Sequence, residues 1–167
     1  MPSLPNEVQS HEGNTHIDQA TDLRPGADER WPFYDQDEVD AVASVLQSGQ
    51  ANQWTGREVF AFEDACSQTF GGNHCVVVGN GTVALELALR AFGIGPGDEV
   101  IVTHRSFVAS AATVLITGAT PVFAEVDRDS GNITPASIEA VLTRRSRAIV
   151  PVHLAGWPCD MAGIMRL

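Results

Sequence analysis

From residue 75 onward, short apolar runs alternate with longer segments of helical periodicity, and no other feature of the sequence limits the fold as much. The runs are rich in β-branched residues, which predicts strands at 75–78, 99–103, 121–126 and 148–153. Strands that are separated by helices pair in parallel, because parallel neighbours need a long crossover connection. The sequence therefore predicts an α/β domain with a mostly parallel sheet flanked by helices.

Helix signals occupy the segments between these runs and also precede them. Asp35 and Glu38 have capping-box spacing, and Thr134 before Pro135 is typical of a helix start. Helices are predicted between the strands at 82–92, 106–117 and 135–143. We expect residues 1–30 to be a disordered polar leader, 31–72 an N-terminal helical segment, and 73–167 the α/β domain.

The first predicted strand ends in a tight turn that opens directly into a helix at Asn80-Gly81-Thr82. Free N–H groups and the positive dipole end of a helix suit an anion such as phosphate. Gly81 has no Cβ, so an oxygen atom can approach its backbone closely, and Thr82 adds a hydroxyl donor. An ordinary strand-to-helix turn, with Asn80 serving only as a helix cap, is the alternative interpretation.

Composition excludes several classes of partner. The net charge of −11 argues against electrostatic binding to nucleic acid or to an anionic membrane. The sequence has no apolar run of the roughly 20 residues that a membrane span needs. Its 3 cysteines and 5 histidines are dispersed, without the spacing of a metal site. We expect reduced cysteines and a cytoplasmic location, because no secretory signal is recognisable.

All 10 basic residues are arginine, so the chain contains no lysine. Whatever the origin of this bias, no side chain can supply the ε-amine that forms a Schiff base.

The carboxyl ends of parallel strands meet at one edge of a sheet, where ligands usually bind. Right-handed crossovers would bring Asn80-Gly81-Thr82, the segment 104–107 and Asp127 to this edge. A phosphate site, an aromatic ring and a carboxylate together suit a flat phosphorylated cofactor.

Linked motifs strengthen this interpretation. They span 80–89, 93–102, 106–111, 118–123 and 151–156. In order and spacing they resemble the DegT/StrS family of pyridoxal-phosphate sugar aminotransferases, from about Trp31 to the C-terminus. The resemblance implies the large domain of the type I aminotransferase fold, pyridoxal 5'-phosphate as cofactor, and a homodimer with active sites at the subunit interface.

The resemblance also implies roles for individual residues. Gly81 and Thr82 match the turn that binds the cofactor phosphate, with Asn80 where serine is more usual. Phe107 matches the aromatic ring that stacks on the pyridine, although packing in the core is an alternative. Trp54-Thr55-Gly56 matches a loop near the active site, where its aromatic ring could simply pack.

Four further polar residues lie near the expected site. Asp127 and His153 match recurrent family positions, and we assign them no chemistry, because loop capping and packing explain them equally well. His104 and Arg105 lie beside the stacking ring and could contact an anionic group, although His104 stands where the family often has proline.

The family's Schiff-base lysine and the aspartate that pairs with the pyridine nitrogen would both fall beyond Leu167. We therefore expect no catalytic residue here, and an N-terminal part of an enzyme, truncated before the later strands and the small domain and inactive alone. The enzyme would transfer an amino group from an amino-acid donor, expected to be glutamate, to a keto group of a nucleotide-linked sugar. Its product would serve cell-surface polysaccharide or antibiotic synthesis.

Two alternatives remain open. One is a non-catalytic truncated paralogue, and the other is a family sugar dehydratase that uses histidine in place of lysine. The coding sequence after the Leu167 codon would separate them from the aminotransferase.

Overall fold

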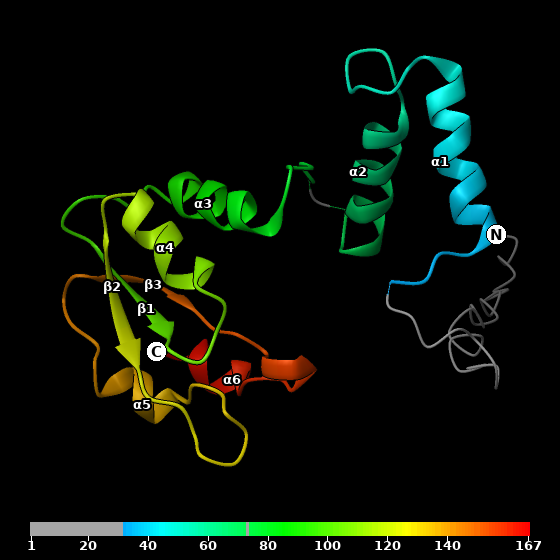
Figure 1. Cartoon of the computed structure of the whole chain (residues 1–167). Coiled ribbons are helices and arrows are strands. Elements are labelled where there is room, and N and C mark those ends of the chain that lie inside the picture. Colours follow the sequence, from blue (N-terminus) through cyan, green and yellow to red (C-terminus); the bar gives the residue numbers. More distant parts are fainter. Residues whose placement is uncertain (1–31, 73) are drawn as a thin grey trace, which may run out of the picture. The chain divides into compact units, whose positions relative to one another are not determined.

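The computed structural model describes residues 32–72 and 74–167, so the predicted leader at 1–30 lies outside the described residues. The chain divides into two compact units, one ending at Glu58 and the other spanning Val59–Leu167. Figure 1 shows the elements of both.

The described part of the first unit contains one helix, α1 (Gln36–Ser48). The Glu38 carboxylate accepts a hydrogen bond from the Asp35 backbone N–H at 2.7 Å, as the capping-box spacing predicted. Gly49 ends the helix with a left-handed φ of 69°, a conformation that glycine adopts without strain. The apolar residues of α1 remain largely exposed, with Leu46 at 67% and Val42 at 62%.

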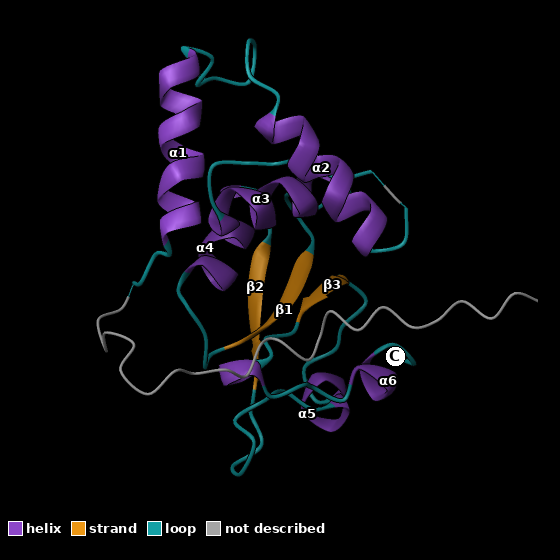
Figure 2. Cartoon of the chain, turned by 90° about the vertical axis from the view of Figure 1, so that its right-hand side faces the viewer, coloured by secondary structure: helices purple, strands orange, loops and turns teal. Residues whose placement is uncertain are grey.

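Three parallel strands form the sheet of the second unit. They are β1 (Glu99–Thr103), β2 (Thr120–Ala124) and β3 (Ser146–Val150), in the order β2-β1-β3. Figure 2 shows the three strands side by side. All five residues of β1 are buried, as expected for a central strand that is covered on both faces. The predicted parallel α/β architecture is therefore confirmed.

Side chains of β1 alternate between two hydrophobic clusters, one on each face of the sheet. Val100 and Val102 pack with Leu89 of α3 (Gly81–Ala91) and Val114 of α4 (Ala109–Ile116). Ile101 points to the other face, which is covered by α5 (Pro135–Glu139) and α6 (Met161–Ile164). This period of two places helices on both sides of the sheet.

The prediction of a strand at 75–78 is wrong for the described structure, which has no strand there. A strand forms only beside a partner, and none of the three described strands pairs with this segment. The Val77 N–H instead donates to Oε1 of Glu63 at 2.8 Å. Glu63 belongs to α2 (Glu58–Thr69), so a side chain replaces the missing strand partner.

Two predicted helices are longer than the observed ones. The helix expected from residue 106 begins at Ala109, and the one expected to reach residue 143 ends at Glu139. The missing turns have tight i to i+3 hydrogen bonds: Ser110 N–H to Phe107 O, and Leu142 N–H to Glu139 O. Such turns are common at helix ends, where periodicity alone places boundaries poorly.

Within the described residues, no helix combines the length and the hydropathy that crossing a membrane requires.

Candidate functional site

The N-terminus of α3 is capped by Asn80. Its side-chain Oδ1 accepts a hydrogen bond from the Val83 N–H at 3.0 Å, and its backbone oxygen accepts one from the Ala84 N–H at 3.1 Å. Capping is therefore an observed role of Asn80, and it fixes the direction in which the first turn of α3 opens.

The next two residues leave their donors unused. No hydrogen bond within the described part of the chain involves the Gly81 N–H, the Thr82 N–H or the Thr82 hydroxyl. A Cβ placed on Gly81 would meet no atom within 4 Å, so the space beside this backbone is open. Two N–H groups, a hydroxyl and the positive end of the α3 dipole thus face an open space, which is the arrangement that binds phosphate.

Phe107 lies between the end of β1 and the start of α4, and 72% of it is exposed. Packing of Phe107 in the core was the alternative interpretation from the sequence. Within the described residues Phe107 is not buried in the core. The turn that carries it is fixed on both sides, because the Ser106 and Ser110 hydroxyls are 2.7 Å apart and the Ser110 N–H bonds to the Phe107 oxygen.

Helices α3 and α4 pack against each other. They run side by side in the same direction, each ending before the strand that follows it (Figure 1). The unused donors of α3 and the exposed ring before α4 therefore occur at corresponding ends of two adjacent helices. The starts of both helices thus lie toward the edge at which the sequence predicted a site, and the grouping of Gly81, Thr82 and Phe107 into one site stays a prediction.

The loop after β2 is organised by Asp127. Its Oδ1 accepts hydrogen bonds from the Ser130 N–H at 2.8 Å, the Ser130 hydroxyl at 2.9 Å and the Asp129 N–H at 3.2 Å. These bonds, first the backbone and then the hydroxyl of Ser130, lower the pKa of Asp127 below the ordinary aspartate value. Loop capping, one of the roles weighed for Asp127 from the sequence, is thus observed.

The loop after β3 is tied to the same region. His153 Nδ1 accepts a hydrogen bond from the Cys159 N–H at 3.0 Å, which fixes the turn into α6. Arg105, at the end of β1, lies against Gly131 of the β2 loop, where any Cβ would collide with its guanidinium.

A hollow of about 500 Å³ opens between these loops, beyond the carboxyl ends of the three strands. Its lining residues are Arg105, Asp127, Asp129, Ser130, Leu154, Ala155 and Trp157. The sequence predicted Arg105 and Asp127 at this edge, but not Trp157. The available signal was position, because the Gly-Trp-Pro turn directly follows the strand predicted at 148–153 and so lies at its carboxyl end.

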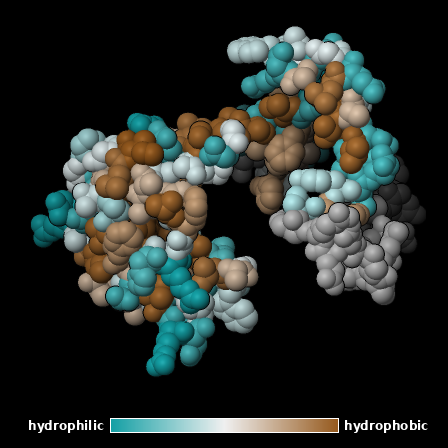
Figure 3. All heavy atoms as spheres, viewed as in Figure 1, coloured by the Kyte–Doolittle hydropathy of each residue, from teal (hydrophilic) through white to brown (hydrophobic). Residues whose placement is uncertain are grey.

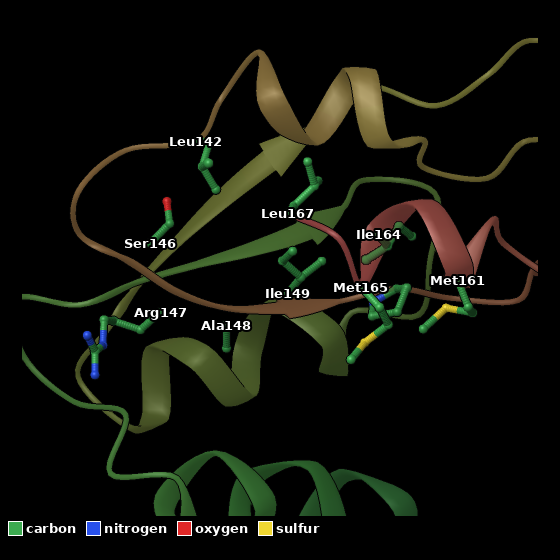
Figure 4. A pocket seen from close by; sticks show the side chains of 10 residues that line it. Leu142, Ser146, Arg147, Ala148, Ile149, Met161, Ile164, Met165 and Leu167 are labelled. Atoms are coloured by element: carbon green, nitrogen blue, oxygen red, sulfur yellow. The ribbon is translucent and has the colours of Figure 1, made fainter.

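A second hollow, of about 360 Å³, lies along β3 (Figure 4). Its lining is mainly apolar, with Ile149 of the strand, Ile164 of α6 and Met165 around it. No aspartate, glutamate, histidine or cysteine side chain lines it, so its side chains offer no general acid or base.

In the part of the chain that the structure describes, the cysteines form no disulfide and no cluster of side chains forms a metal site. Cys66, Cys75 and Cys159 are free thiols. Burial raises the pKa of the Cys159 thiol, whose Sγ donates to the Val152 oxygen at 3.2 Å. No group of three His, Cys, Asp or Glu side chains within 32–72 and 74–167 is arranged to hold a metal ion.

In a parallel α/β sheet with helices on both faces, ligands usually bind beyond the carboxyl ends of the strands, where the open N-terminus of α3 and the exposed ring of Phe107 also occur. Residues 32–167 match the model of the DegT/DnrJ/EryC1/StrS aminotransferase family. The chain therefore belongs to this family, as its motifs predicted.

Known relatives agree with this assignment. The spore coat polysaccharide biosynthesis protein SpsC of Bacillus subtilis is 44% identical over 134 residues, which are 80% of this chain and 34% of SpsC. The GDP-perosamine synthase of Caulobacter vibrioides is 43% identical over 136 residues, 81% of this chain and 36% of that protein. The chain thus spans about a third of the length of the curated relatives that it matches.

Solved structures show the same fold. The aminotransferase of Psychrobacter cryohalolentis superimposes with a TM-score of 0.79 at 55% identity, over 82% of this chain and 35% of that one. The PLP-form of the putative sugar aminotransferase Spr1654 of Streptococcus pneumoniae gives a TM-score of 0.75 at 32% identity, over 81% of this chain and 34% of that one.

Proposed function

We propose that the chain is the cofactor-phosphate-binding part of a pyridoxal-phosphate-dependent sugar aminotransferase. In this proposal Gly81 and Thr82 hold the phosphate, Asn80 orients the turn that carries them, and Phe107 stacks on the pyridine ring. Residues 73–167 then belong to the large domain of the enzyme, and 31–72 are the helical segment that precedes it.

The observation that carries the proposal is the unused donor set at the start of α3. Its two N–H groups and the Thr82 hydroxyl match the needs of a phosphate dianion, and the open space beside Gly81 admits its oxygens. An exposed Phe107 at the corresponding end of α4 offers a flat face for an aromatic ligand. The residues present therefore fit the phosphate and the ring of this cofactor.

Pyridoxal phosphate, when bound, withdraws electrons from the reacting carbon and carries the amino group between donor and acceptor. The residues of this chain would bind and orient it. The α3 N-terminus anchors the phosphate, and Phe107 limits rotation of the ring and keeps water from one of its faces. A side-chain amine for covalent attachment would have to come from outside these 167 residues, because they contain no lysine.

The relatives support a proposal for the substrate of the whole enzyme. We propose that the whole enzyme aminates a keto group on a nucleotide-linked sugar, with an amino acid such as glutamate as donor, and that it works as a cytoplasmic homodimer. GDP-perosamine synthase and a spore coat polysaccharide biosynthesis protein, both above 40% identity, support a role in surface polysaccharide synthesis.

The proposal is tested by non-covalent binding of pyridoxal phosphate to the 167-residue chain, measured by equilibrium dialysis. We expect pyridoxal phosphate to bind more tightly than pyridoxal, and inorganic phosphate to compete with it, because the phosphate supplies the main contacts. Thr82→Val and Phe107→Leu should each weaken binding about tenfold, which corresponds to about 1.4 kcal/mol.

Matched controls of the same residue types are available elsewhere in the second unit. Thr120→Val changes an exposed threonine at the start of β2, and Phe92→Leu an 84% exposed phenylalanine at the far end of α3. Both should leave affinity unchanged. Equal affinity for pyridoxal and pyridoxal phosphate, or equal losses in the control variants, would contradict the proposed phosphate and ring sites.

A further inference from the structure

The hollow at the carboxyl edge of the sheet combines three kinds of chemistry in one place. Arg105 follows β1, Asp127 and Asp129 follow β2, and Trp157 follows β3. Arg105 precedes Phe107 by two residues in the chain. The hollow that Arg105 lines is therefore next to the turn that carries the proposed stacking ring.

A buried asparagine joins two walls of the hollow. Asn132 is only 4% exposed; its Nδ2 donates to the Trp157 oxygen at 2.9 Å, and its Oδ1 accepts from the Leu154 N–H at 3.2 Å. The backbone N–H of Asp127 in turn donates to the backbone oxygen of Asn132 at 2.8 Å. The loop that carries Trp157 is therefore fixed against the loop that carries the carboxylates before any ligand arrives.

Trp157 is held by its backbone while 66% of it is exposed. Its N–H donates to the Leu154 oxygen at 2.9 Å, which closes a tight turn in which Ala155 has a left-handed φ of 51°. A non-glycine residue in this conformation is uncommon and is held there by its surroundings. The result is a fixed aromatic surface at the rim of the hollow, suited to the apolar C–H face of a pyranose ring.

Arg105 supplies the positive charge. Its guanidinium lies over Gly131, where a Cβ would also come within 2.9 Å of Leu154 Cδ2. The ion pairs of the described residues are Arg90–Glu86 and Arg145–Glu99, so Arg105 is not neutralised by a described carboxylate. A guanidinium of this kind binds phosphate oxygens through paired N–H donors.

We propose that this hollow binds the sugar-phosphate part of the substrate, an inference that rests on the proposed function. The pyranose ring stacks on Trp157, its hydroxyl groups donate to the Asp127 and Asp129 carboxylates, and the phosphate on the anomeric carbon pairs with Arg105. A purely apolar ligand would leave Arg105 and both carboxylates desolvated without partners, so it fits the hollow less well.

The proposal is tested by ligand-observed NMR with the 167-residue chain, with glucose 1-phosphate and methyl glucoside as the observed probes and inorganic phosphate as a competitor for the Arg105 contact. Glucose 1-phosphate should give saturation transfer that is strongest at its ring protons. Trp157→Ala should weaken the binding of both sugars about fivefold, and Trp157→Phe should restore it, because stacking needs only an aromatic face. Arg105→Ala should weaken glucose 1-phosphate but not methyl glucoside.

Two variants serve as matched controls. Phe92→Ala removes an exposed aromatic ring from the far end of α3, and Arg144→Ala removes an exposed arginine just before β3, at the opposite edge of the sheet. Neither should change the signals of any probe. Absence of saturation transfer from both sugars in the wild-type chain, or equal effects of Phe92→Ala and Trp157→Ala, would overturn the proposal.

Failure of this inference can be told apart from failure of the proposed function. If Trp157→Ala and Arg105→Ala keep pyridoxal phosphate binding while the sugars do not bind at all, the cofactor site stands and the sugar site is overturned. If glucose 1-phosphate binds as expected while pyridoxal phosphate does not, the hollow is a sugar-phosphate site and the proposed function is wrong.

Discussion

At the scale of the residue, the loop after β2 shows how one carboxylate oxygen, Oδ1 of Asp127, organises the backbone around a candidate site. Oδ1 of Asp127 accepts hydrogen bonds from the Ser130 hydroxyl and from two backbone N–H groups. The backbone oxygen of Asp127 accepts a further hydrogen bond from the Gly131 N–H at 2.9 Å. The turn then places Gly131 where Arg105 crosses it. The charge of Asp127 is thus used to fix a loop that presents other side chains.

Removing the Ser130 hydroxyl should raise the pKa of Asp127 toward its ordinary value, because that hydroxyl is one of the donors that lower it. A group whose pKa is depressed by folding stabilises the fold above its unfolded-state pKa. That contribution is lost as the pH falls through the lower folded-state pKa. The expected result in Ser130→Ala is loop loosening at a higher pH than in wild type.

Carbon-detected NMR titration of the Asp127 carboxyl measures this shift. Ser137→Ala is the control, because Ser137 caps α5 and has no bond to Asp127. An unchanged midpoint in Ser130→Ala would mean that the backbone donors alone set the pKa of Asp127.

At the scale of the element, β1 carries the core of the second unit. It has a partner strand on each side and a hydrophobic cluster on each face. Ile101 is fully buried in one cluster, whereas Ile116, at the end of α4, is 52% exposed. The two isoleucines therefore differ in the apolar surface that folding removes from water.

Ile101→Ala should lower the free energy of unfolding by about 2–5 kcal/mol, because it removes buried methylene groups and leaves a cavity. Ile116→Ala should change it by less than about 1 kcal/mol, since much of that side chain already contacts water. Urea titration followed by far-UV circular dichroism measures both. Equal losses would show that β1 is not the centre of the cooperative unit.

At the scale of the whole molecule, hydrophobic attraction and charge repulsion have opposite effects on self-association of the chain. Large apolar side chains are exposed on both units, visible as brown patches in Figure 3, with Phe92, Leu115 and Phe123 among those of the second unit. Within the described sheet, β2 and β3 each have an unpaired edge. Exposed apolar surface and open strand edges favour association, whereas a net charge of −11 opposes it.

We expect the 167-residue chain to self-associate, and the average mass to rise with sodium chloride from about 0.02 M to about 0.5 M. Added salt shortens the Debye length and screens the repulsion between like-charged copies. Size-exclusion chromatography with light scattering gives the mass at each salt concentration. A monomer across the whole range, with a cooperative thermal transition, would show that the second unit is self-sufficient despite its exposed surface.

Much of the fold could be predicted because its signals are local. Alternation of apolar runs and helical periods, the capping box of Asp35 and Glu38, and the cap at Thr134 all act within a few residues. The prediction of a strand at 75–78 was wrong because strand pairing is not a local property. The Val77 N–H of that segment donates to the Glu63 side chain and not to a neighbouring strand.

The residues of the candidate site also fall into two groups, those with a local sequence signal and those brought together only by the fold. Asn80, Gly81, Thr82 and Phe107 were predicted from a turn and a set of motifs, which are contiguous in the chain; their assignment to the cofactor stays a proposal. The hollow was not predicted as a whole, because Trp157 meets Arg105 and Asp127 only through loops that follow three different strands.

The sequence by itself determined the parallel α/β class, the family, the start of α3 and the absence of a side-chain amine, because each depends on residue identity and short-range order. Tertiary structure decided which apolar runs became strands and which helix ends face open space. It also decided which loop residues share a hollow. These outcomes depend on partners far apart in the chain, whose contacts form only when the sheet assembles.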